Sequence, residues 1–219
     1  MFDANFVSML LRELGATLYM TLASTAISYL LGLPLGVLLV TSEKGGLKPM
    51  RVLNQTLNVV VNILRSVPFL ILILVLVPVT RAIVGTSIGS TATIVPLVIG
   101  ATPFVGRLVE GSLREVYRGV VDAAVSMGAS PWQIVRKVLL PEALPSLVTG
   151  AALATITILG YSAMAGAVGG GGLGNVAIMY GSNRYQFDVM IVCVIILVCV
   201  VQLFELIGRI AARAVDKRK

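Results

Sequence analysis

The fold is decided by a long uncharged stretch near the C-terminal end of the chain. Residues 143–183 read ALPSLVTGAALATITILGYSAMAGAVGGGGLGNVAIMYGSN, 41 residues without Asp, Glu, Lys or Arg. A helix that crosses a bilayer needs about 20 mostly apolar residues. The stretch therefore holds either two spans or one span and a loop. Pro145 suits the first turn of a helix, whereas the glycine-rich residues 169–174 disfavour a continued helix. We predict one span followed by a flexible outer loop.

The composition puts the whole chain in the class of membrane proteins. Of 219 residues, 57% are hydrophobic and 12% are charged, whereas a soluble domain carries about 25% charged residues. The net charge of +7 falls in short clusters between apolar runs, which argues against the basic patch of a nucleic-acid binder. The chain has no His, so imidazole catalysis and most zinc sites are excluded. Cys193 and Cys199 share one apolar run and are not expected to pair.

Further apolar runs bring the predicted number of spans to five in a single domain, residues 1–219. The spans are expected near residues 15–40, 66–84, 88–108, 145–168 and 187–210. Arg65 is the one charge inside a run, and a charge in a bilayer should face protein or water. Because Pro68 indicates a span that begins near Ser66, we expect Arg65 at the inner boundary; the alternative is contact with a substrate carboxylate.

Residues 52–64 would then form a separate helix on the membrane surface. Asn54, Asn58 and Asn62 recur at every fourth position and are predicted to form its wet face.

The basic residues indicate how the spans are oriented. With five spans, thirteen of the 17 Lys and Arg fall on one side and three on the other. The positive-inside rule places the majority in the cytoplasm, so the N-terminus is expected outside and the C-terminus inside. Asp3, Glu13 and the lack of a basic start argue against a cleavable signal peptide. The thirteen are Lys44, Lys48, Arg51, Arg107, Arg114, Arg118, Arg136, Lys137, Arg209, Arg213, Lys217, Arg218 and Lys219; the three are Arg12, Arg81 and Arg184.

One cytoplasmic segment, residues 109–141, is long enough to have a structure of its own. Its pattern predicts helices over 105–116 and 120–127 and a third that begins at Ser130-Pro131, an N-cap residue followed by a first-turn proline. Pro141 is expected to end the third helix. Its apolar residues recur on one face, so periodicity alone fits an amphipathic hairpin on anionic headgroups equally well.

The same segment contains a family motif. Asp122-Ala123-Ala124-x3-Gly128-x9-Val138-Leu139-Leu140-Pro141 resembles the E-A-A-x3-G-x9-I-x-L-P loop of ABC importer permeases, with Asp for Glu and Val for Ile. The resemblance implies a coupling helix that docks into a groove on a separate ATPase subunit. Small residues allow close approach, and a carboxylate can accept an arginine of the partner. The implied contact residues are Asp122, Ala123, Ala124, Met127, Gly128, Ala129, Ser130, Trp132 and Ile134.

Residues 62–69, 84–89, 134–145, 160–164 and 171–174 extend this resemblance to the methionine-importing branch of the family. It implies an all-α, type I permease fold in the cell inner membrane, a homodimer and a solute-binding lipoprotein on the outer face. It also implies import of L- and D-methionine and derivatives by alternating access. ATP and Mg²⁺ would be held by two ATPase subunits, with no cofactor, metal or enzymatic activity on this chain. The alternatives are a permease for an osmoprotectant such as choline or glycine betaine, or for another amino acid.

The glycine run invites a comparison with nucleotide-binding loops. It lacks the Lys and the preceding strand of a Walker motif, so ATP hydrolysis is expected on another polypeptide. An intramembrane enzyme is disfavoured because no span has a paired acid–base set, and the loop motif argues against a scaffold protein.

Residues for the translocation path come from two spans. Thr157, Tyr161 and Met164 share one helix face, with Ser162 beside it, and the resemblance places Met164 at the dimer axis as a gate. Ordinary packing of small residues is the alternative. The complete candidate set is Arg65, Ser66, Phe69, Thr157, Tyr161, Ser162 and Met164.

Overall fold

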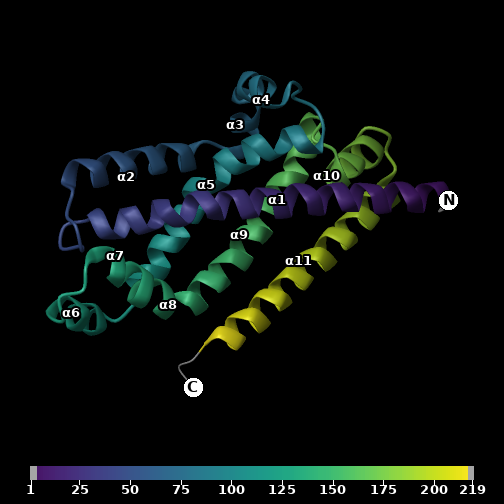
Figure 1. Ribbon diagram of the computed structural model, residues 1–219. Coiled ribbons are helices and arrows are strands. Elements are labelled where there is room, and N and C mark those ends of the chain that lie inside the picture. The colour runs from purple at the N-terminus through teal and green to yellow at the C-terminus, as the bar shows by residue number, and fades with distance from the viewer. Residues whose placement is uncertain (1–3, 217–219) are drawn as a thin grey trace.

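The computed structural model describes residues 4–216, which form helices joined by short turns, with no strand among them (Figure 1). Four helices are long and apolar enough to cross a membrane: α1 (Ala4–Ser42), α5 (Ser90–Arg114), α9 (Leu144–Ala165) and α11 (Phe187–Val215). A fifth span results if the bent pair α2 (Arg51–Ser66) and α3 (Phe69–Val75) counts as one. The all-helical prediction is confirmed.

The shorter elements are α4 (Val77–Val84), α6 (Arg118–Ser126), α7 (Pro131–Ile134), η1 (Val135–Leu139), α8 (Leu140–Glu142), η2 (Gly166–Val168), α10 (Gly172–Val176) and η3 (Ala177–Ser182). Helix α5 runs unbroken to Arg114, so the helix predicted over 105–116 is the end of a span rather than a separate element. Helices α1 and α11 also extend beyond the predicted spans. Asp3 and the tail residues Lys217, Arg218 and Lys219 lie outside the described residues.

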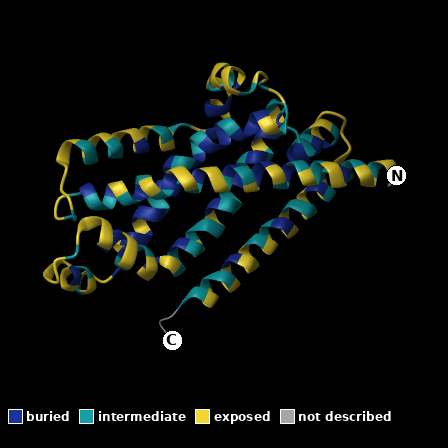
Figure 2. Ribbon diagram, in the orientation of Figure 1, coloured by how far each residue is buried: buried dark blue, intermediate teal, exposed yellow. Residues whose placement is uncertain are grey.

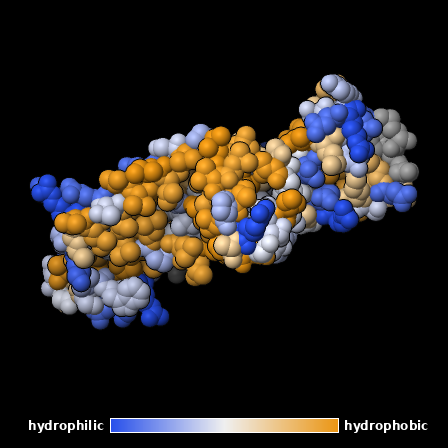
Figure 3. Space-filling view, turned by 90° about the horizontal axis from the view of Figure 1, so that it is seen from above, coloured by the Kyte–Doolittle hydropathy of each residue, from blue (hydrophilic) through white to orange (hydrophobic). Residues whose placement is uncertain are grey.

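The middle of the bundle is covered by apolar side chains. Figure 3 shows a broad hydrophobic band across the molecule, with hydrophilic side chains towards both ends. In the most apolar window of α11, only 6% of the residues are buried within the chain. A soluble monomer rarely exposes so large an apolar surface. This apolar band is therefore expected to contact lipid or a neighbouring chain in the membrane.

Helices α1 and α5 approach closely along a stripe of small residues on α1. A Cβ atom added to Gly36 would lie 2.6 Å from Val109 Cβ and 2.7 Å from the Gly106 carbonyl oxygen. Inside a bilayer, helices associate through van der Waals contact rather than water release, so small residues at the contact are favoured. The buried members of the stripe are Thr17, Thr21, Ser24, Ser28, Gly32 and Gly36.

Helix α2 has its polar face turned inward, the reverse of a soluble helix. Asn54 Nδ2 donates to the Leu39 carbonyl at 2.8 Å, and Asn58 Nδ2 donates to Asn54 Oδ1 at 3.0 Å. Asn62 Oδ1 accepts from Arg107 of α5 at 2.9 Å. The opposite face is apolar and exposed (Figure 2); it includes Val52, Val59, Val60 and Ile63.

This orientation corrects the prediction of a surface helix with its asparagines in water. Helix α2 runs back alongside α1 (Figure 1), and its 16 residues rise about 24 Å. Arg65, near its end, therefore lies beside the middle of α5, not at the inner boundary. An amphipathic period shows that two faces differ, but it does not show which face contacts protein and which contacts lipid.

The predicted span over residues 66–84 is also corrected, because this region is not one helix. The chain bends by 101° between α2 and α3, and α4 follows after a further break at Leu76. Val67 adopts the extended backbone (φ −78°, ψ 124°) that a following proline favours, here Pro68. Pro78 lies in the first turn of α4, where its missing N–H costs no helical hydrogen bond.

The glycine-rich segment is not a flexible loop, and this prediction is wrong. Gly172 begins the short helix α10, and its N–H donates to Glu13 Oε2 of α1 at 2.8 Å. The Leu173 N–H donates to Thr17 Oγ1 at 2.9 Å. A Cβ atom on Gly174 would collide with the backbone of Ala163. The glycines permit close backbone packing within the bundle rather than mobility.

The close α1–α5 contact predicts the effect of one methyl group. Gly36→Ala should destabilise the protein by ~1–3 kcal/mol, the usual cost of overpacking, because Val109 and the Gly106 carbonyl leave no room for a Cβ atom. Gly15→Ala in the same helix, where nothing lies within 4 Å, is the matched control and should be neutral or slightly stabilising. Thermal unfolding of both variants in detergent measures the difference. Equal melting temperatures would contradict the packing argument.

Candidate functional site

The segment that carries the family motif forms a tight turn between α6 and α7. Gly128 has φ +78°, a left-handed conformation that side chains disfavour. Its N–H donates to the Val125 carbonyl at 2.9 Å, and the Ala129 N–H donates to the Ala124 carbonyl at 3.1 Å. This pair of bonds is a Schellman motif. The backbone conformation therefore favours glycine at position 128.

The next helix begins directly after this turn. Ser130 Oγ accepts from the Gln133 N–H, and Gln133 Oε1 accepts from the Ser130 N–H at 2.8 Å, which together form a capping box. The predicted start at Ser130 is confirmed. Because one helix ends and the next begins within a few residues, the α6–α7 tip has a defined shape.

The predicted contact residues divide into an outward and an inward group. Met127 is 81% exposed and Trp132 is 68% exposed, so both large apolar side chains are available for contact with a partner. Ala124 (5%) and Ile134 (1%) are buried in the core of this chain, which corrects their assignment to a docking surface: they hold the tip in place. The outward group, called here the tip surface, comprises Asp122, Ala123, Met127, Gly128, Ser130 and Trp132, with Ala129 half-buried.

The tip surface is connected to span α9 by nearly continuous helix. Pro141 was predicted to end the third helix, but the chain passes it through a π-helical turn, η1, and the short helix α8. A wider turn removes the need for the N–H that proline lacks. Residues 131–165 therefore form one bent rod, and a displacement of the tip would be transmitted to α9.

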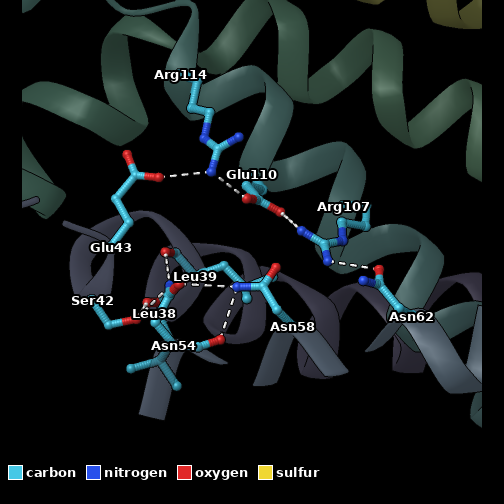
Figure 4. Close-up of polar contacts among 10 residues, drawn as sticks. All are labelled: Leu38, Leu39, Ser42, Glu43, Asn54, Asn58, Asn62, Arg107, Glu110 and Arg114. Atoms are coloured by element: carbon cyan, nitrogen blue, oxygen red, sulfur yellow. Dashed lines mark hydrogen bonds and ion pairs between the residues drawn. The ribbon is translucent and has the colours of Figure 1, made fainter. Parts of the chain in front are cut away.

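A buried carboxylate of α5 is the centre of a polar cluster that also includes side chains of α2 and of the loop after α1 (Figure 4). Glu110 is 3% exposed and pairs with Arg107 and with Arg114, both at 2.7 Å. Arg114 also pairs with Glu43 after α1 at 2.7 Å, and Arg107 donates to Asn62 of α2. Sequence reasoning missed Glu110, although its spacing of three and four residues from the two arginines was an available signal.

A cavity of about 480 Å³ lies between α6 and the loop after α1. Arg114, Arg118 and Asp122 line it together with Glu43 and Gly46. Asp122 thus lies beside basic side chains of its own chain, at the same end of the molecule as the loop 43–50.

The predicted path residues lie in different surroundings. Arg65, Phe69 and Tyr161 line one pocket of about 250 Å³, and the Phe69 and Tyr161 rings are stacked with centroids 4.5 Å apart. Met164 is 45% exposed and does not line this pocket. Ser162 is 1% exposed and donates to the Leu159 carbonyl. Its assignment to the path is corrected, because this side chain is enclosed by helix packing.

The two remaining hydroxyls are used within their own helices. Ser66 Oγ donates to the Asn62 carbonyl at 2.8 Å, and Thr157 Oγ1 donates to the Leu153 carbonyl at 2.9 Å. Neither lines the Arg65 pocket.

Comparison with known proteins gives a consistent result at three levels. Residues 15–219 match the family described as "Binding-protein-dependent transport system inner membrane component". The probable D-methionine transport system permease protein MetI of Vibrio cholerae is 54% identical over 210 residues, 96% of this chain and 93% of its own length. The D-methionine transport system permease MetI of Escherichia coli K12 is 51% identical over 158 residues, 72% of this chain and 73% of its own.

Among solved structures, an inward-facing form of the MetNI methionine ABC transporter contains a chain that is 46% identical. It superposes with a TM-score of 0.97 and covers 99% of this chain and 100% of its own. A chain of an amino acid ABC transporter, at 20% identity and a TM-score of 0.79, shares the fold.

The buried Glu110 cluster predicts a large difference between two similar substitutions. Glu110→Gln leaves Arg107 and Arg114 without their shared counter-charge, and breaking a buried ion pair costs about 3–5 kcal/mol. Glu43→Gln should cost less than about 1 kcal/mol, because the Glu43 side chain is 27% exposed and surface pairs contribute little. Thermal unfolding in detergent measures both. If Glu43→Gln is equally harmful, Glu110 is not the centre of the cluster.

Proposed function

The chain belongs to the family of binding-protein-dependent transport system inner membrane components, and from this premise we propose that it is the permease subunit of an ATP-driven methionine importer. It is a multi-pass inner-membrane protein with the type I permease fold. The assignment of the substrate rests on the 54% identity over 96% of the chain to a probable D-methionine permease. The proposed cargo is L- and D-methionine and their derivatives. An osmoprotectant permease is the alternative, which the relatives do not favour.

The proposed orientation places the N-terminus outside and the C-terminus inside. Three basic regions lie at one end of the molecule: the loop after α1, the α6–α7 segment and the end of α11 (Figure 1). The start of α1 and the turn between η3 and α11 lie at the other end (Figure 1); these segments contain Arg12 and Arg184. The positive-inside rule assigns the basic end to the cytoplasm.

The tip surface is proposed to dock on a separate ATPase subunit. Exposed Met127 and Trp132 offer apolar contact area, and large apolar anchors dominate most interfaces. Two such ATPase subunits would hold ATP and Mg²⁺, since the glycine segment of this chain packs against Glu13 and Thr17 and has no lysine. The rod of residues 131–165 would carry the motion of the tip into the bilayer.

A second copy of the chain is proposed to complete the translocation path. Five helices seldom enclose an opening wide enough for an amino acid, and exposed apolar faces on α2, α3 and α4 remain available. A solute-binding lipoprotein would deliver the cargo at the outer end, and alternating access would release it inside.

The function is tested by reconstitution. Proteoliposomes with this chain, its ATPase and its binding protein should take up labelled methionine, and omission of this chain should abolish uptake, because the ATPase has no route across the bilayer. Glycine betaine should neither be imported nor stimulate ATP hydrolysis. Import of glycine betaine without methionine would decide for the osmoprotectant alternative.

The docking role of the tip surface is tested by two glycines in equivalent conformations. Gly128 (φ +78°) and Gly45 (φ +85°) both have open space where a Cβ atom would lie, and a side chain at either should cost roughly 1–2 kcal/mol through backbone strain. Gly128→Leu should also place four carbons in the interface, so ATPase co-purification and ligand-stimulated hydrolysis should be lost. Gly45→Leu should retain both. If the two variants behave alike, strain rather than docking explains the effect.

A further inference from the structure

The pocket beside Arg65 has the composition of a ligand site rather than of a packing defect. It is lined by Leu64, Arg65, Val67, Phe69, Leu72, Gly100, Phe104 and Tyr161. Its volume of about 250 Å³ is just below the ~300–1,000 Å³ typical of drug-sized ligands. A single amino acid is therefore a suitable occupant.

The Arg65 guanidinium has no counter-charge within residues 4–216. It makes no hydrogen bond or ion pair with the described residues, in contrast to Arg107 and Arg114 on the neighbouring helix. Arg65 lies beside the middle of α5, because Gly100 shares its pocket. An ionisable residue at this depth is a functional-site hypothesis by default. A guanidinium offers a fork of donors that matches a carboxylate.

The rest of the lining suits an apolar or thioether side chain. Phe69 and Tyr161 form a parallel stack, 6° between planes, and Phe104 adds a third ring. Sulfur and aliphatic groups pack favourably on aromatic rings. At Gly100 a Cβ atom would approach Leu72 Cδ2 to 3.1 Å and Phe69 Cδ2 to 3.3 Å, so the absence of a side chain there keeps the pocket open.

We propose that this pocket is an intramembrane subsite for an α-amino acid, in which Arg65 binds the carboxylate and the Phe69–Tyr161 stack receives the side chain. The inference rests on the proposed function and assigns a residue-level binding site within it. One ionic contact and non-directional apolar contacts do not fix the handedness of a ligand, because chiral discrimination needs three points of attachment. The subsite would accept L- and D-amino acids alike.

The first test uses the wild-type chain in complex with its ATPase in lipid nanodiscs. A diazirine analogue of methionine, irradiated in the complex, should label peptides containing Phe69, Phe104 or Tyr161. Excess L-methionine or D-methionine should compete, whereas methioninol, which lacks the carboxylate, should not. Label confined to the lipid-facing helix α11, or equal competition by methioninol, would overturn the subsite.

The second test removes the charge. Arg65→Gln should lower both labelling and methionine uptake per ATP hydrolysed roughly ten- to hundredfold, the usual effect of losing a charged hydrogen bond. Arg65→Lys should be intermediate, and ATPase co-purification should be normal. Arg81→Gln is the matched control, since Arg81 is exposed, as Arg65 is, but does not line the pocket.

The experiments distinguish an error in the proposed function from an error in the proposed subsite. If wild-type proteoliposomes import no methionine, the proposed function fails. If wild type imports methionine and Arg65→Gln retains full uptake and labelling, the subsite alone is wrong. Should Arg65→Gln not assemble, the competition pattern on wild type still decides.

Discussion

The structure depends on one constraint: inside a bilayer no water is available, so an unpartnered polar group is costly and backbone groups must find their partners within the protein. This explains three features that are distant in the sequence. The asparagines of α2 face α1 and α5, Glu110 lies between two arginines, and Glu13 accepts from the buried Gly172 N–H at the start of α10. The asparagine and Glu13 contacts join different helices. Glu110 pairs with two arginines of its own helix, and these arginines in turn contact Asn62 of α2 and Glu43 after α1. Polar groups therefore act here as the specific connections of the bundle, while apolar contacts supply its general cohesion.

Features determined by local chemistry were predictable from the sequence. The uncharged runs marked the long helices, and Ser130-Pro131 marked a helix start because capping depends on neighbouring residues alone. Features that depend on which surfaces pack against each other could not be predicted from the sequence. The period of α2 is the same whether its asparagines face water or protein, and residues 169–174 have the same composition in a loop as in a close backbone contact. Of the residues predicted for the path, Arg65, Phe69 and Tyr161 share a pocket, whereas Ser162 is enclosed by packing.

The tip surface, proposed for docking, and the Arg65 pocket, proposed for binding, are connected through a continuous series of helices. The tip surface continues through η1 and α8 into α9, and Tyr161 of α9 lines the pocket that contains Arg65. Arg65 is part of α2, and the Asn62–Arg107 hydrogen bond attaches α2 to α5. A movement at the tip can thus change the separation of Tyr161 from Phe69. Binding and release of the cargo would then follow the state of the ATPase without any contact between the two.

Helix α11 has a consequence for how this sequence can change over evolutionary time. Its outer face touches almost nothing in the chain, and its most apolar window is only 6% buried. Selection on that face acts on total hydropathy and length, not on the identity of any one residue, so Leu, Ile, Val and Phe are nearly interchangeable there. The glycines packed against Ala163 and Asn175 have no such freedom. Divergent descendants of this chain should accumulate most of their neutral substitutions along α11.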